Sequence, residues 1–252
     1  MKKTILFFFW SAISTIIFSQ KNNTTTYQNY FQQEVNYDIE VTLDDKNHIL
    51  KGVANIEYIN NSPDELNEIY FHLWANAYKN QRTAFAKQKI QSGATDFFFA
   101  KKEEMGGYTQ IDFSINNESA NWSYDEKNID IVLLKLNKTL LPSQSIQIRV
   151  PFEIKIPKYF SRMGHRHQAY YMAQWYPKPA VYDRTGWHPM PYLEYGEYYS
   201  EFGKYDVKIT LPKNYVVAAT GDLQTETEKA FLIKRVRATN KFAAKNYPVG
   251  LK

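Results

Sequence analysis

The chain has 252 residues, with 31 Lys and Arg against 26 Asp and Glu, and no cysteine. This length suits one large domain or two small ones, and a hydrophobic fraction of 44% can build a core, which argues against a disordered chain. The lack of cysteine excludes disulfides, thiolate metal sites and a cysteine nucleophile. A formal net charge of +5 is too small to indicate nucleic acid as a partner.

The start of the chain has the pattern of a secretory signal peptide. Two lysines precede an apolar run over residues 5–18, and polar sequence follows. That run is too short to span a bilayer comfortably, which takes about 20 residues, so a retained anchor is the less favoured alternative. We therefore expect a cleaved signal peptide over residues 1–19 and an extended lead-in over residues 20–33. The mature protein is expected to be secreted or periplasmic, without a stable membrane anchor.

Period-two alternation of apolar and polar residues predicts a half-buried strand just after the lead-in. The side chains on its apolar face are Val35, Tyr37, Ile39, Val41 and Leu43. A second strand is expected over residues 49–59, with Val53, Ile56 and Tyr58 in the core. Further strand-like runs cover residues 66–73, 129–136, 146–154, 205–211 and 215–219.

Helical periodicity is scarce in this sequence. Short helices are expected only over residues 79–89 and from Lys229 onward, and residues 93–107 are expected to form a long irregular connection. Many short strands punctuated by Pro, Asn and Asp predict an all-β fold with sandwich-like antiparallel and mixed sheets. We expect one β domain over residues 34–235.

Histidines and catalytic motifs give little sign of chemistry within the chain. His165 and His167 could share one face of a strand, as in some metal sites, but the basic residues around them favour a solvated loop. His72, on a predicted strand, is expected to be a hydrogen-bonded structural residue. The sequence has no H-E-x-x-H, G-x-S-x-G or G-x-x-x-x-G-K motif, so no catalytic or metal-binding residue is assigned.

Residues 170–205 are the densest candidate region for recognition, with twelve aromatic side chains. Four carboxylates are interleaved with them: Asp183, Glu194, Glu197 and Glu201. Rings beside carboxylates suit a cationic amine or the face of a sugar, and packing in a β fold is the alternative interpretation. A glycosidase pair would need one of the three glutamates to face Asp183.

Six segments, in this order, resemble the opening domain of the aminopeptidase N family of zinc metallopeptidases (gluzincins), in a secreted bacterial form. They are YDIEVTLD at 37–44, the run over 50–60, LNEIYFHL at 66–73, QWYPKPA at 174–180, the run over 186–207, which includes GWHP and GEYYSEF, and VVAATGDL at 216–223. The QWYPKPA segment is similar to the family's Gln-x-Glu/Gln-Pro-x-x-Ala stretch. The resemblance covers residues 34 to 235.

The resemblance implies a saddle-shaped β domain that docks on a second, mainly helical domain. In the family that second domain carries H-E-x-x-H and the zinc. Residues 236–252 are therefore expected to be a C-terminal extension truncated before a catalytic domain. The resemblance thus implies zinc only for a full-length enzyme, a missing C-terminal catalytic domain as partner, and no peptidase activity of this chain alone.

The resemblance also assigns a substrate-binding stretch, which in the family holds the amino terminus of a peptide. Gln174 matches the family's first Gln, and Tyr176 stands where Glu or Gln is usual. A phenol carries no charge at neutral pH, so this departure weakens the expected selectivity for an amine. Trp175 and Trp187 are expected to be packing residues.

Two alternatives of other kinds stay open from the sequence. One is a secreted carbohydrate-binding module that uses the aromatic residues of 170–205 as stacking platforms, which would require exposed rings. The other is a stand-alone structural or interaction domain. Exposed aromatic rings would favour the first, and rings packed in the fold would favour the peptidase domain.

Overall fold

The computed structural model describes residues 30–196 and 198–245, so the predicted signal peptide lies outside the described residues. The chain falls into two compact units, with the boundary between Thr210 and Leu211. All the strands belong to the first unit, which confirms the prediction of an all-β fold. The domain limits predicted at residues 34, 235 and 252 stay predictions.

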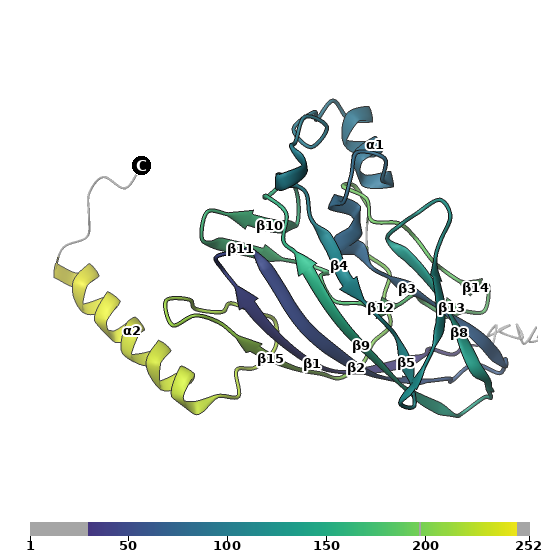
Figure 1. The fold of residues 1–252 in the computed structure, drawn as a ribbon. Helices are drawn as coiled ribbons and strands as arrows, with labels where there is room; N and C mark the ends of the chain where they lie inside the picture. The colour runs from purple at the N-terminus through teal and green to yellow at the C-terminus, as the bar shows by residue number, and fades with distance from the viewer. Residues whose placement is uncertain (1–29, 197, 246–252) are drawn as a thin grey trace, which may run out of the picture. The chain divides into compact units, whose positions relative to one another are not determined.

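The larger sheet of the first unit has seven strands (Figure 1). Its order is β15 (Tyr205–Thr210), β1 (Glu34–Asp44), β2 (Ile49–Ile59), β9 (Ser145–Lys155), β5 (Ser114–Ile115) and β6 (Glu118–Ser119), and β4 (Gly107–Ile111) also pairs with β9. The pairing of β15 with β1 is parallel, and the other pairings of this sheet are antiparallel. The sheet is therefore mixed, with β15 at one edge.

A second, antiparallel sheet and two hairpins complete the unit. The sheet has the order β12 (Lys178–Pro179), β3 (Leu66–His72), β8 (Ile131–Leu140) and β7 (Asn121–Tyr124). One hairpin joins β10 (Met163–Arg166) to β11 (Ala169–Met172), and the other joins β13 (Tyr182–Asp183) to β14 (Gly186–Trp187). The short strand β12 matters most for the site, because it anchors the end of the QWYPKPA segment.

Apolar side chains at alternating positions of the strands fill a core to which both sheets contribute. All five apolar side chains predicted to face inward on β1 are buried. On β2 the buried side chains are Leu50, Ala54, Ile56 and Tyr58, and Val53 is half-buried on the other face, so the prediction that Val53 lies in the core is wrong. An offset of one residue moves a side chain to the other face of a strand. The two sheets meet where the ring of Phe71 on β3 packs edge-on against that of Phe113, directly before β5. Their centroids lie 5.1 Å apart.

Helices are few, as predicted, but one begins later than expected. The first unit contains η1 (Trp74–Tyr78), α1 (Ala84–Gln91) and η2 (Lys102–Glu104). The Asn80 side chain accepts a hydrogen bond from the Arg82 amide, which favours a turn where the helix was predicted to start. The Thr83 hydroxyl then accepts from the Ala86 amide at 3.2 Å and caps α1. Apart from η2, residues 93–106 are irregular, as expected.

The second unit contains α2 (Glu226–Lys245), which begins a few residues before the predicted helix. The strand predicted over residues 215–219 is wrong, because these residues pair with no strand among those described. Pro212 opens a turn in which its carbonyl accepts from the Tyr215 amide at 3.1 Å, and this bend interrupts the extended run. No helix of the described part of the chain has the length and apolar character needed to cross a membrane.

Candidate functional site

The two predicted substrate-binding residues lie in the loop between β11 and β12. Gln174 adopts a left-handed backbone conformation with φ 56°, which is uncommon for a residue with a Cβ. Two contacts fix the segment that follows Gln174. The carbonyl of Trp175 accepts from the Tyr108 hydroxyl at 2.7 Å, and Lys178 is paired opposite His72 on β3.

The side chain of Gln174 is half-buried and faces into the protein through its oxygen. Oε1 accepts a hydrogen bond from Nζ of Lys178. An ammonium group has donors only, so the amide atom that faces it is the carbonyl oxygen. The described residues give Nε2 no hydrogen-bond partner, and this amide nitrogen is not fully buried.

Lys178 sits in a cage of uncharged groups. Lys178 is 1% exposed, and its ammonium also donates to Oγ of Ser200 at 3.0 Å. Nζ lies 3.9 Å from the ring centroid of Trp74, and 5.8 and 5.6 Å from those of Tyr176 and Tyr198, within the range of cation–π attraction. No carboxylate of the described residues forms an ion pair with it. Burial therefore lowers the pKa of Lys178 to about 7.

His72 lies beside this cage and is structural, as predicted. Its ring stacks on that of Trp74 at 4.5 Å, and its Nε2 accepts from the backbone amide of Met190 at 3.1 Å. Burial, followed by the charge of Lys178, lowers the pKa of His72 to about 3. The imidazole is therefore neutral at physiological pH and packs next to the buried ammonium without repelling it.

Tyr176 points toward the edge of the larger sheet. Its hydroxyl donates to the hydroxyl of Tyr205 on β15 at 3.2 Å, and its ring meets the ring of Tyr37 on β1 edge-on at 5.4 Å. Burial, and then the hydrogen bond with Tyr205, raises the pKa of Tyr176, so the phenol stays uncharged. Gln174 and Tyr176 thus have different neighbours, and Lys178 is the residue that lies near both.

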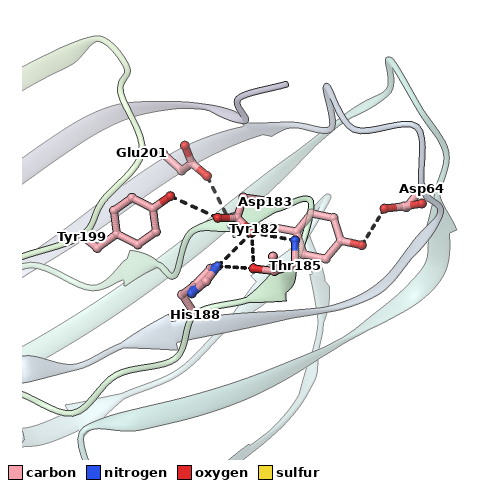
Figure 2. Close-up of polar contacts among 7 residues, drawn as sticks. All are labelled: Asp64, Tyr182, Asp183, Thr185, His188, Tyr199 and Glu201. Atoms are coloured by element: carbon pink, nitrogen blue, oxygen red, sulfur yellow. Dashed lines mark hydrogen bonds and ion pairs between the residues drawn. The ribbon is translucent and has the colours of Figure 1, made fainter. Parts of the chain in front are cut away.

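A second polar cluster surrounds Asp183 in the β13–β14 hairpin (Figure 2). One carboxylate oxygen accepts from the amide and hydroxyl of Thr185 at 2.8 and 2.7 Å and lies 2.9 Å from Nε2 of His188. The other accepts from the hydroxyl of Tyr199 at 3.3 Å. Burial alone would raise the pKa of Asp183, but the hydrogen bonds from His188 and Thr185 outweigh it and lower that pKa. Asp183 is therefore ionised.

This cluster is not a nucleophilic triad, although it contains a hydroxyl, an imidazole and a carboxylate. Nε2 of His188 lies 3.1 Å from Oγ1 of Thr185 and also faces Asp183. A triad needs the two partners on different ring nitrogens, so that one orients the imidazole while the other exchanges a proton with it. The hydroxyl of Thr185 is, in addition, already donated to Asp183.

Of the three glutamates considered as partners for Asp183, Glu201 is the one that joins this cluster. Its Oε1 accepts from the Tyr182 amide at 3.3 Å, while Glu197 lies outside the described residues. Burial, with a further contribution from the charge of Asp183, raises the pKa of Glu201 to about 7. A neutral acid beside an ionised one is the electrostatic pattern of an acid–base pair. Glu201 is only 8% exposed, however, which leaves little access for a substrate.

His165 and His167, which were expected to lie in a solvated basic loop, belong to the β10–β11 hairpin. His165 lies on β10, and its Nδ1 is 3.3 Å from the carbonyl oxygen of His167, which belongs to the hairpin turn. The ring of His165 stacks instead on that of His48, with centroids 3.6 Å apart. Within the described ranges, no group of three or more His, Asp or Glu side chains is placed to hold a metal ion.

The aromatic side chains of residues 170–205 divide into packed and exposed sets. Trp175 packs against Phe152, and Trp187 contacts the rings of Tyr58 and Tyr70, which confirms their predicted packing role. The exposed rings are Tyr171, Tyr195, Tyr199, Phe202 and Tyr205, and Tyr192 is buried. The remaining rings are half-buried.

The Lys178 cage could not be predicted from the sequence. Its sequence signal is a lysine inside QWYPKPA, where every other residue after the Gln is apolar or aromatic. Burial of that lysine depends on Trp74 and Ser200, which are distant in the sequence.

Comparison with known proteins finds similarity in solved structures alone: no protein-family model matches the chain, and no curated protein matches it. An M1 zinc metallopeptidase from Deinococcus radiodurans, in a mutant form bound to a Tyr-Ser-Ala substrate, is 15% identical with a TM-score of 0.44. That match covers 78% of this chain and 37% of the metallopeptidase. A second structure of this metallopeptidase is 16% identical with a TM-score of 0.43, and covers 78% and 36% of the two chains.

A third match is a mutant of a two-domain M1 zinc metallopeptidase bound to L-arginine, with 14% identity and a TM-score of 0.42. The chain spans a little over a third of the length of the solved structures that it matches, 36 to 37%. Each of these matches therefore concerns one part of the metallopeptidase chain.

Proposed function

We propose that this chain is the N-terminal domain, or a fragment, of a secreted zinc metallopeptidase of the aminopeptidase type. Its role is to form the wall of the cleft that receives the amino-terminal end of a peptide, and to dock on a catalytic domain. Gln174 and Tyr176 lie on the substrate-facing side of this wall. The six ordered segments in the sequence support the assignment.

The observation that carries the proposal is the state of Gln174. A left-handed backbone, a half-buried side chain and a bond to the caged Lys178 hold this residue in one position. Backbone strain of this kind persists where surrounding structure fixes it, and it is concentrated at functional sites. Gln174 is also the residue that matches the family's peptide-binding Gln.

Exposed aromatic rings support the docking part of the proposal. Phe202 is 77% exposed and Tyr195 is 62% exposed, and both belong to the aromatic region of residues 170–205. Aromatic residues are enriched in the buried centres of protein interfaces. Covering these rings with a second domain would remove apolar surface from water.

Zinc belongs to the proposed full-length enzyme and has no place among the described residues of this chain. Among the described residues, no group of three or more His, Asp or Glu side chains is placed to hold a metal ion. The chemical step is proposed for the catalytic domain of the full-length enzyme. What its residues supply is binding and orientation of the peptide.

Replacement of Gln174 by Ala in the full-length enzyme tests the proposal. We expect kcat/KM for amino-terminal substrates to fall about tenfold, the effect of losing one hydrogen bond in the substrate complex. Circular dichroism and thermal unfolding should show a folded domain. Gln91→Ala, at the exposed end of α1, is the matched control and should leave the rate unchanged. An unchanged rate for Gln174→Ala would refute the role.

The carbohydrate-binding alternative keeps one supporting observation, the exposed rings of Tyr195, Tyr199 and Phe202. Against it, both tryptophans of the aromatic region are half-buried and packed on other rings. Titration with oligosaccharides separates the two functions. A saturable change in aromatic fluorescence would favour the binding module, and the proposed peptidase domain predicts none.

A further inference from the structure

The sequence resemblance implies that Gln174 meets the amino terminus of the peptide through an acceptor oxygen, but in the structure that oxygen already binds Lys178. We propose that Lys178 fixes the polarity of Gln174, so that this loop offers an N–H donor to an oxygen of the ligand and does not accept an ammonium group. The ligand group that it selects is a carbonyl or a carboxylate. This inference rests on the proposed role of Gln174 in substrate binding.

The polarity follows from the hydrogen-bonding capacity of the two groups. A lysine ammonium donates and cannot accept, whereas a glutamine amide donates through its nitrogen and accepts through its oxygen. Turning the amide of Gln174 by half a rotation would place its NH2 against the ammonium of Lys178. Both groups would then lose a hydrogen bond, one of them buried and charged, which is the costly case.

Lys178 cannot easily leave this position. Its ammonium donates to Ser200 as well as to Gln174, lies over the ring of Trp74, and is almost fully buried. In β12 its backbone is paired with His72 of β3. With two protons given to acceptors and the charge held against an aromatic face, the ammonium has satisfied partners only in this arrangement.

The opposite end of the amide is the end available to a ligand. Nε2 of Gln174 has no partner among the described residues and is not buried. Its N–H groups match a carbonyl oxygen of a peptide or the carboxylate of an organic acid, since both accept hydrogen bonds. A ligand ammonium would meet a donor there, with the Lys178 charge a few ångströms behind it.

Titration followed by NMR measures this polarity directly on the full chain. The side-chain NH2 signals of Gln174 are identified as the pair that is missing from the Gln174→Glu spectrum. Three probes are added separately at about pH 6, where the ammonium is charged. N-acetylglycinamide offers carbonyl oxygens, acetate offers a carboxylate, and methylammonium offers a cation alone.

The proposal predicts a saturable shift of the Gln174 signals with N-acetylglycinamide, with acetate or with both, and no shift with methylammonium. A shift with the first identifies a peptide carbonyl as the preferred group, and a shift with the second identifies a carboxylate. A shift with methylammonium, or no shift with any of the three, would overturn the proposal.

Two variants test the two residues separately: Gln174→Glu removes the N–H donor, and Lys178→Met removes the ammonium group that orients it. Gln174→Glu keeps an acceptor for Lys178 but has no N–H, so the affinity for the oxygen probes should fall about tenfold or more. Gln91→Glu makes the same charge change on the exposed end of α1 and should not alter it. Binding to Gln174→Glu is followed through the Tyr176 and Trp175 signals.

Lys178→Met removes the ammonium and keeps a long apolar side chain in the cage. The Gln174 amide is then free to turn, and methylammonium should begin to shift its signals. If the variant retains the selectivity of the parent chain, Lys178 does not set the polarity. Should this variant not fold, the Gln174→Glu comparison still decides whether a donor is offered. Failure of the full-length enzyme to depend on Gln174 would refute the proposed function without changing these binding results.

Discussion

Lys178 is a lysine buried among uncharged groups. Its pKa is lowered from 10.5 to about 7 because burial penalises the charged form. Between these two values the unfolded chain holds a proton that the folded chain has released. Stability therefore rises with pH across this window.

Replacing Lys178 by Met tests this linkage. From about pH 7.5 to 9 the parent chain should gain about 2 kcal/mol of unfolding free energy relative to the variant, which cannot titrate there. Urea unfolding at the two pH values measures the difference. Lys51→Met, on an exposed position of β2, is the control and should keep the slope of the parent. Equal slopes for the parent and Lys178→Met would contradict the lowered pKa of the buried lysine.

Glu201 gives a pH dependence of the opposite sign. Burial raises its pKa from 4.5 to about 7, so between these values the folded chain holds a proton that the unfolded chain has lost. Its contribution to stability is complete below pH 4.5 and is lost as the pH rises through 7. Glu201→Gln should flatten this loss, measured by thermal unfolding at several pH values. The exposed Glu103→Gln should behave like the parent, and a parent-like slope in Glu201→Gln would argue against a buried, protonated Glu201.

Single residues of the candidate site were only partly predictable. Gln174 and Tyr176 could be named because they stand in a recognisable segment, whereas the cage around Lys178 could not. Its walls come from Trp74 and Ser200, which reach the lysine only after β12 pairs with β3. The partner of His165 was missed for the same reason, since the approach of His48 is a property of the tertiary fold.

At the scale of elements, the entry of the chain into β15 depends on one close backbone contact. The segment before β15 runs along β1, where the Val35 amide donates to the Phe202 carbonyl at 3.2 Å and the Tyr37 amide to the Lys204 carbonyl at 2.8 Å. A Cβ on Gly203 would lie 1.7 Å from the carbonyl oxygen of Val35, so the two backbones can meet only at a glycine.

Gly203→Ala should therefore destabilise the fold by about 1–3 kcal/mol, because the added methyl group must push β1 and the following segment apart. Urea unfolding of the full chain measures this change. Lys204→Ala, at the next position with an exposed side chain, is the control and should change stability by about 0.5 kcal/mol or less. A neutral effect of Gly203→Ala would show that β15 does not need this contact.

The elements that sequence could predict are those long enough to show a period. The eleven-residue strands β1, β2 and β9 alternate clearly, and their predicted limits fall within a residue or two of the observed ones. Strands of two to five residues, such as β5, β12 and β13, are too short to carry a pattern and form because neighbouring strands pair with them. The run at 215–219 has strand-like composition but no pairing partner among the described strands.

For the whole molecule, the first unit has a buried core from two sheets and still leaves aromatic rings such as Phe202 and Tyr205 exposed. Such rings are the part of the molecule that a second domain would cover in the proposed enzyme. Secretion is also proposed at this scale, because the segment that predicts it lies outside the described residues.

The intact mass and zinc content of the native secreted product test the central proposal most directly. An antibody against this domain isolates the product, and mass spectrometry and metal analysis follow. The proposal predicts a species far larger than the 29.6 kDa of this chain, with zinc bound. A secreted species at or just below 29.6 kDa, free of zinc, would contradict it and favour the carbohydrate-binding module.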